Sequence, residues 1–231
     1  MKATQEKQNA RLETIDAIKN LTRPDIRTPF IIILINFFFV MLSGPFAVIF
    51  YAVEIFKDAG VDTNEHLSAI LSALVRVAGG VLGIFLVQKL PRLRLAMVTI
   101  TLMSISMIGL GIVIYLKNIW GSNQILNILP IIFVTMYMFS FGAGVGPLQW
   151  VFMGELLPPE YKVLSGIINC LSTIAIFMVT KMFPTLQLCL SPHGTYWLFA
   201  AIALTSNVHY YFFVPETKNK SLLEIQTIFK K

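Results

Sequence analysis

One basic residue lies inside an apolar run that is long enough to cross a membrane. Arg76 stands in the middle of the run Leu67–Val87, too deep for its guanidinium to reach a membrane surface easily. A charge at that depth costs roughly 2.5–3.5 kcal/mol on insertion scales, so it needs a cavity or an acceptor. Two interpretations stay open: a structural arginine that donates to helix carbonyls, or a residue that lines a polar pathway.

A second candidate is the glycine-rich run Phe141–Trp150, which reads FGAGVGPLQW. Gly142, Gly144 and Gly146 stand at alternate positions before Pro147, and this composition disfavours a continuous helix. A broken helix at membrane depth is tolerated where it lines protein or a cavity, and transporters use such breaks at their binding sites. The sequence therefore favours a bent helix beside a cavity, with an ordinary proline kink as the alternative.

Two further runs carry polar or small residues at helical spacing. Asn169 shares one helix face with serines and a threonine, and its carboxamide suits a neutral polar ligand or a neighbouring helix. The run that contains Arg76 also carries a stripe of small residues, which permits two helices to approach closely. The polar face comprises Ser165, Asn169, Ser172 and Thr173, and the stripe comprises Ser68, Ser72, Gly79, Gly80 and Gly83.

No other constellation indicates catalysis. The three histidines and the two cysteines, Cys170 and Cys189, have no metal-ligand spacing. The sequence contains no nucleotide fingerprint and no nucleophile elbow, and its apolar runs have no carboxylate near their middle. We therefore expect a protein that is not an enzyme and uses neither a metal nor a cofactor.

The elements that position these residues are expected to be membrane helices. The 231 residues are 56% hydrophobic and only 13% charged, with a mean hydropathy of +0.73, whereas soluble domains average about 25% charged residues. Six runs approach the roughly 20 apolar residues that a crossing helix needs. They are Phe30–Val53, Leu67–Val87, Leu95–Leu116, Ile125–Trp150, Val163–Phe183 and Thr195–Val214.

Basic residues outside these runs or close to their ends predict the orientation. Fourteen lysines and arginines fall on the side of the two termini and three on the other, which predicts cytoplasmic termini. The net charge of +6 is then explained without nucleic acid. We expect three segments: a cytoplasmic segment 1–28 with a short amphipathic helix, a six-helix membrane domain 29–214, and a cytoplasmic tail 215–231. A solvated tail is the alternative for residues 1–20.

Three groups of short motifs occur in an order that is known from one family of membrane proteins. They are Leu42–Gly44 with Phe50 and Tyr51, Gly146–Trp150 with Glu155–Pro158 and Lys162, and Pro215–Ile225. They resemble the seventh-helix, tenth-helix and C-terminal signatures of the sugar porter family of the major facilitator superfamily. Within that family, the sequence most resembles insect facilitated trehalose and glucose transporters. The resemblance implies an all-α membrane protein, the C-terminal six-helix half of a twelve-helix fold.

The resemblance also implies roles for individual residues. Trp150 matches a sugar-stacking tryptophan and Asn169 an asparagine that contacts sugar, while Arg76 falls where the family has a further asparagine. The implied gating residues are Tyr51, Phe50, Gly142, Gly144, Gly146 and Pro147. The implied cytoplasmic charge network is Arg92, Glu155, Lys162 and Glu216, with Glu155 paired to Arg92.

Departures from the family pattern weaken the assignment of a sugar substrate that the resemblance implies. Val40 and Met41 replace a glutamine pair, and Gln149 replaces the second proline of the tenth-helix motif. The expected function is facilitative transport of a hexose or trehalose by alternating access, in the plasma membrane among lipids. The expected partner is a missing N-terminal half or a second copy. The alternative is a non-transporting homologue: a sensor, a partner subunit or a decayed fragment.

Overall fold

The computed structural model describes residues 21–60, 64–121, 123–157 and 161–220, together with positions 224, 225, 227 and 229. The expected amphipathic helix of residues 1–20 lies outside these residues. The regular structure in the described chain is helical, as a membrane requires of a segment that must satisfy its own backbone. The helices are α2 (Pro24–Leu42), α3 (Pro45–Phe50), α4 (Ala52–Asp58), α5 (Glu65–Lys89), α6 (Arg92–Trp120), α7 (Gln124–Ala143), α8 (Val145–Leu156) and α9 (Lys162–Phe213).

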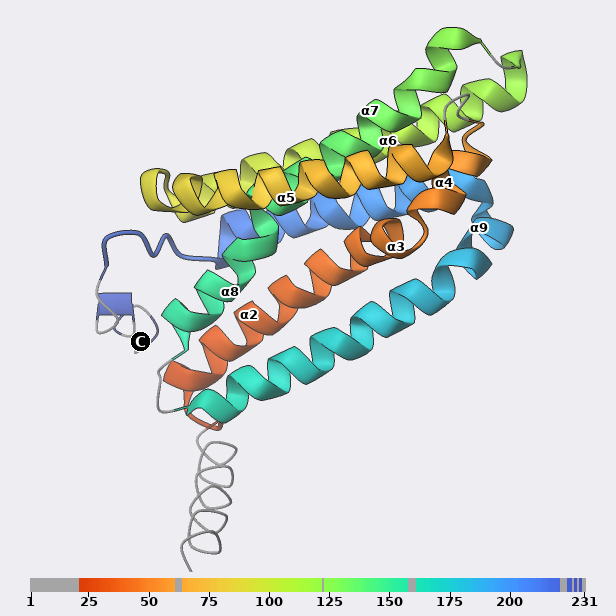
Figure 1. Ribbon diagram of the computed structural model, residues 1–231. Helices are drawn as coiled ribbons and strands as arrows, with labels where there is room; N and C mark the ends of the chain where they lie inside the picture. Colours follow the sequence, from red (N-terminus) through yellow and green to blue (C-terminus); the bar gives the residue numbers. More distant parts are fainter. Residues whose placement is uncertain are drawn as a thin grey trace, which may run out of the picture.

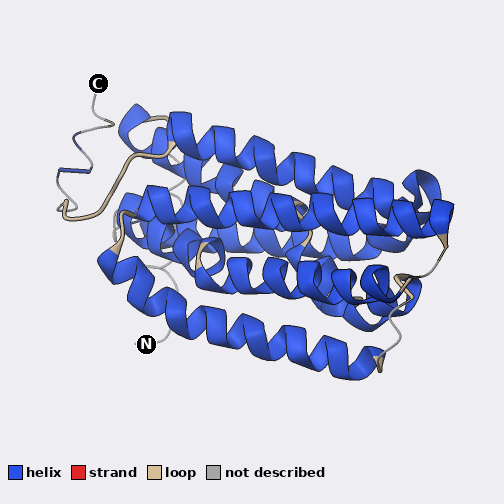
Figure 2. Cartoon of the chain, turned by 90° about the horizontal axis from the view of Figure 1, so that it is seen from above, coloured by secondary structure: helices blue, strands red, loops and turns tan. Residues whose placement is uncertain are grey.

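These helices pack side by side in one elongated bundle (Figures 1 and 2). Five helical segments in the described residues are long and apolar enough to cross a membrane. The first four contain one predicted span each, and the last contains two. Successive segments run in alternate directions, so the start of α2 and the end of α9 lie at the same end of the bundle (Figure 1).

The last two predicted spans belong to one helical element with a single break. Residues 184–194 lie between the two predicted runs, and apart from Ser191 they are helical, so both runs belong to the 52-residue α9. The backbone leaves helical geometry at Ser191, with φ of 63° and ψ of 161°, and there the chain turns back along the bundle (Figure 1). Pro192 follows at once, where a helix start loses nothing through its missing N–H.

The first predicted span is divided into α2, α3 and α4. Gly44, between α2 and α3, has φ of 95°, in the left-handed region that favours glycine. A Cβ on Gly44 would also lie 2.6 Å from the ring of Phe199. Tyr137 of α7 donates its hydroxyl hydrogen to the carbonyl of Ser43 at 2.8 Å. The break is therefore fixed by backbone geometry, by packing and by a buried hydrogen bond.

Replacing Tyr137 by phenylalanine should destabilise the protein by about 1 kcal/mol, because the Ser43 carbonyl loses its buried donor while the ring packing remains. Thermal unfolding of the purified protein in detergent would measure this change. Tyr115→Phe is the control, because the Tyr115 hydroxyl makes no hydrogen bond among the described residues and its side chain is 43% exposed. Equal stability of the two variants would contradict a structural role for the Tyr137 hydroxyl.

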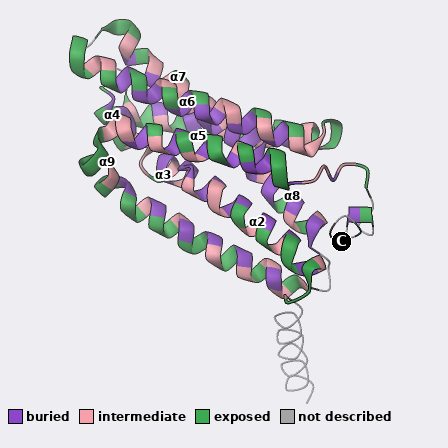
Figure 3. Cartoon of the chain, turned by 180° about the vertical axis from the view of Figure 1, so that it is seen from behind, coloured by how far each residue is buried: buried purple, intermediate pink, exposed green. Residues whose placement is uncertain are grey.

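Helix α5 contacts α7 through small residues, and its large side chains point outward. A Cβ on Gly79 would lie 2.7 Å from the carbonyl oxygen of Phe139, and a Cβ on Gly142 would overlap the carbonyl oxygen of Arg76. Large apolar side chains such as Leu74 stay exposed, as the exposed strips in Figure 3 illustrate. That face suits lipid tails or a neighbouring helix. The buried residues of α5 are Ser68, Ser72, Gly79 and Gly83.

Candidate functional site

A cleft of about 370 Å³ opens between helices that are far apart in the sequence. It contains all three residues predicted to contact a substrate: Arg76 from α5, Trp150 from α8 and Asn169 from α9. The cleft is largely apolar with a few polar groups, which is typical of a small-molecule site. Its lining residues are Phe37, Met41, Phe46, Arg76, Val77, Gly80, Phe141, Gly142, Gly146, Pro147, Gln149, Trp150, Asn169, Ser172 and Ile176.

The break between α7 and α8 forms one wall of this cleft. The helix is interrupted at Gly144, with φ of −136° and ψ of −93°. In this described part of the chain, no backbone hydrogen bond joins the carbonyls of residues 141–143 to an amide beyond the break. Pro147 lies in the first turn of α8, where its missing N–H costs no helical bond. The predicted bent helix is therefore a true interruption, and Gly142, Gly146 and Pro147 line the cleft.

Trp150 presents the one indole of the cleft lining. Its ring meets Phe37 of α2 edge-on, with the ring centroids 5.3 Å apart and the planes at 87°. Because Phe37 is fully buried, it restricts the orientation of the tryptophan. The indole remains 47% exposed, so it offers a flat apolar surface and an N–H donor to a ligand.

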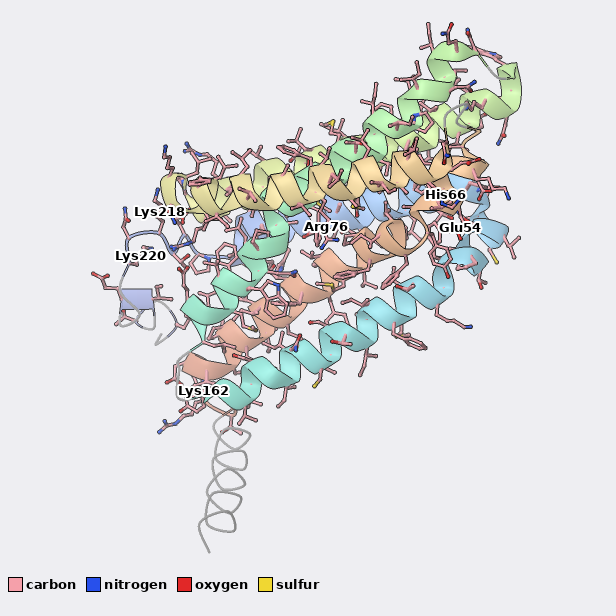
Figure 4. The ribbon with its side chains drawn as sticks, in the orientation of Figure 1. Glu54, His66, Arg76, Lys162, Lys218 and Lys220 are labelled. Carbon is pink, nitrogen blue, oxygen red and sulfur yellow. The ribbon has the colours of Figure 1, made fainter. Side chains whose placement is uncertain are left out.

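Arg76 lies near the middle of the bundle, away from Glu54 at one end and from Lys218 at the other (Figure 4). Its partly buried side chain lines the cleft and also a smaller cavity of about 50 Å³. Among the described residues, no carboxylate lies within ion-pair distance of its guanidinium, and no hydrogen bond to it is present. The contacts therefore favour a cleft-lining arginine over one that is bonded to helix carbonyls.

Two carboxamides share the cleft with Arg76. Asn169 is exposed on α9, near Ser172, whose hydroxyl donates to the carbonyl of Ile168 at 2.6 Å. Gln149 of α8 is 3% exposed, and its Oε1 is buried without a partner in the described residues. Sequence reasoning treats Gln149 only as a departure from a motif and misses its place here. The sequence feature that could have indicated this place is the position of Gln149 directly before Trp150 in the glycine-rich run Phe141–Trp150.

The two predicted aromatic gate residues lie outside the cleft. Tyr51 connects α3 to α4, and its ring packs on Phe183 of α9 with centroids 5.0 Å apart. Phe183 in turn stacks on Phe199 at 6.1 Å. Phe50 is 64% exposed. The structure thus builds Tyr51 into an aromatic cluster and leaves Phe50 on the surface.

Charged residues connect several elements at the end of the bundle where α6 begins. Arg92 Nη2 lies 2.7 Å from Glu155 Oε1, the pair that the family resemblance implies. Glu216 accepts the backbone N–H groups of Arg92 and Leu93, both at 3.1 Å, so its carboxylate caps the N-terminus of α6. Lys162 is exposed at the start of α9 and makes no ion pair within the described chain, and Figure 4 shows it at the foot of that helix.

Replacing Glu216 by glutamine should loosen the tail, because a neutral amide holds the positive end of α6 more weakly than a carboxylate. We expect trypsin to cleave after Lys218 and Lys220 several-fold faster than in the unmodified protein. Glu54→Gln is the control, since Glu54 is exposed at the opposite end (Figure 4). Unchanged cleavage in Glu216→Gln would show that the cap does not restrain the tail.

The arrangement is that of a multi-pass integral membrane protein with half of a major facilitator superfamily fold. The proton:xylose symporter XylE, solved with bound 6-bromo-6-deoxy-D-glucose, matches with a TM-score of 0.74 at 23% sequence identity. The match covers 97% of this chain and 49% of that chain, and at this identity it concerns the fold. The model of the family described as Sugar (and other) transporter matches residues 1–229. The chain belongs to this family, which is a family of transporters and not of enzymes.

Curated relatives confirm the resemblance to insect transporters. The facilitated trehalose transporter Tret1 of Polypedilum vanderplanki is 36% identical over 214 residues, which cover 91% of this chain and 42% of the relative. Tret1 of Apis mellifera ligustica is 32% identical over 223 residues, covering 96% of this chain and 44% of the relative. The chain therefore spans less than half the length of these relatives.

Proposed function

We propose that the chain forms the C-terminal half of a facilitative sugar transporter that moves a hexose or trehalose by alternating access. One observation carries the proposal: the cleft gathers Arg76, Gln149, Trp150 and Asn169 beside a broken helix. Polar side chains and broken helices inside a membrane domain mark substrate pathways. The family and the trehalose transporters among the relatives support a sugar as the substrate.

The cleft supplies the contacts that a sugar needs. Trp150 stacks against an apolar face of the sugar ring, and the carboxamides of Asn169 and Gln149 bond its hydroxyl groups. The buried Oε1 of Gln149 gains most, because it has no partner among the described residues and a buried unpaired acceptor costs about 1–3 kcal/mol. Because this oxygen is inaccessible in the structure, the Gln149 side chain turns toward the cleft when a sugar hydroxyl donates to it, and this bond favours the occupied cleft.

The break at Gly144 supports alternating access in this proposal. Half-helix α8 carries both Trp150 and Glu155, so a rotation about the break couples the cleft to the Arg92–Glu155 pair. The pair is partly exposed and contributes little to stability by itself, but such a pair biases two conformations that are close in energy. In this mechanism Tyr51 and Phe50 close the opposite end, and Arg92, Glu155, Lys162 and Glu216 act on the cytoplasmic side.

A second lobe completes the transporter in this proposal. An N-terminal six-helix half or a second copy packs on the side of α5, whose large apolar side chains are exposed. Alternating access then moves one lobe against the other around the cleft. The distribution of basic residues supports cytoplasmic termini, and the family supports the plasma membrane as the location.

Uptake into lipid vesicles tests this proposal. The purified chain is reconstituted alone and together with an N-terminal half taken from the Polypedilum vanderplanki relative, and labelled glucose and trehalose are supplied outside. We expect saturable uptake of at least one sugar when two lobes are present, and loss of uptake in Trp150→Ala. Uptake that rises linearly with sugar concentration in every combination would overturn the proposal.

A sugar-binding chain that does not transport is the second candidate. The observation in its favour is Arg76, a cation at a position where the resemblance implies a neutral asparagine. Saturable sugar binding by vesicles that show no uptake with either second lobe would select this candidate. Saturable binding accompanied by uptake would select the transporter.

A further inference from the structure

We infer that the cleft prefers a sugar that carries a negative charge, such as a sugar acid, over a neutral sugar of the same size. This inference rests on the proposed function, because it concerns the same cleft and names the class of sugar. The observation that carries it is a guanidinium in the cleft wall that has no counter-charge among the described residues.

The charge of the cleft comes from Arg76 alone among its lining residues. The other fourteen are apolar, glycine, or neutral polar side chains, and none is aspartate or glutamate. Two described carboxylates illustrate why Arg76 has no counter-charge. Glu155 pairs with Arg92, and Glu54 lies at the end of the bundle, away from Arg76 (Figure 4). The cleft therefore presents one positive charge to whatever enters it.

A guanidinium at this depth binds a carboxylate well. Its N–H groups match the two carboxylate oxygens in a bidentate pair, and such charge-assisted bonds are about twice as strong as neutral ones. The apolar surroundings reduce the screening that weakens surface pairs. A neutral hydroxyl at the same position accepts a weaker bond and leaves the arginine charge uncompensated.

The remaining walls still fit a sugar ring. Trp150 offers its exposed indole, and Asn169 and Gln149 offer carboxamides. A volume of about 370 Å³ lies in the usual range for small-molecule pockets. A ring held by these groups places a carboxylate substituent near Arg76, so the preference concerns one substituent and not the whole ligand.

Three sugars with the same ring and different charges test the inference. Glucuronate is an anion at neutral pH, glucose is neutral and glucosamine is a cation. Their affinities are measured by isothermal titration of the full chain in lipid nanodiscs. We expect glucuronate to bind at least about tenfold more tightly than glucose, since hydrogen bonds to charged groups contribute that much or more, and glucosamine to bind most weakly.

Variants show whether the preference for glucuronate comes from Arg76 or from the positive charge of the protein as a whole. Arg76→Gln should remove the preference for glucuronate, and Arg76→Lys should keep part of it through its remaining charge. Lys181→Gln is the control, because Lys181 is an exposed cation of α9 outside the cleft lining. We expect Lys181→Gln to leave all three affinities unchanged.

The outcomes distinguish this inference from the proposed function. Equal affinity for glucose and glucuronate in the unmodified protein would overturn the inference and leave the sugar cleft intact. A preference for glucuronate that survives Arg76→Gln would also overturn it. Binding of none of the three sugars would overturn the proposed function as well.

Discussion

Replacing Trp150 by alanine should weaken sugar binding by roughly thirtyfold or more. Large aromatic anchors in binding sites typically contribute about 2 kcal/mol or more, and Trp150 is 47% exposed and lines the cleft. Its orientation comes from the buried Phe37, so the surface is already in place before the ligand arrives. Equilibrium binding of glucose and glucuronate to the reconstituted protein would measure the loss.

Trp120→Ala is the matched control for this variant. Trp120 ends α6 and is 76% exposed outside the cleft, so its removal should leave the affinity unchanged. Thermal unfolding of both variants shows whether a loss of binding reflects a loss of folding. If Trp150→Ala binds sugar as tightly as the unmodified protein, the cleft is not the sugar site.

Replacing Gly142 by alanine should destabilise the bundle by about 1–3 kcal/mol, the usual cost of inserting a methyl group into tight packing. The added Cβ would overlap the carbonyl oxygen of Arg76 and come within 3.2 Å of the backbone nitrogen of Gly80. Backbone atoms cannot rotate away, so α5 must shift from α7. Because the displaced segment carries Arg76, ligand affinity should fall together with the unfolding temperature.

Gly154→Ala is the control with the opposite expected sign. Gly154 lies inside α8, and a Cβ there would meet no atom within 4 Å. Alanine is favoured over glycine in a helix by roughly 0.5–1 kcal/mol, so this variant should unfold at a slightly higher temperature. Equal unfolding temperatures for Gly142→Ala and Gly154→Ala would contradict the close contact between α5 and α7.

Much of the site follows from the sequence because membrane residues obey strict constraints. The sequence predicts that Arg76 faces a cavity or an acceptor, and the alternate glycines before Pro147 favour a bent helix over an ordinary proline kink. Both statements concern single helices, and both agree with the cleft and with the interruption at Gly144. The stripe of small residues on α5 likewise indicated a close helix contact, although not the helix that supplies it.

Other features depend on contacts that no local pattern contains. The two apolar runs predict two spans but not how they are joined, and in the structure α9 is helical on both sides of the single break at Ser191. The cap that Glu216 provides for α6 joins positions 124 residues apart. It uses backbone N–H groups, which a search for opposite charges does not find.

The location of Asn169 in water or in lipid gives the most direct test of the central claim. Asn169→Cys is prepared with Cys170 and Cys189 replaced by serine, since both native cysteines are exposed, and reconstituted vesicles are treated with a water-soluble, membrane-impermeant maleimide. A side chain in an aqueous substrate cleft should react, and saturating sugar should slow the reaction several-fold. Reaction with a lipid-soluble maleimide only, unaffected by sugar, would contradict the account.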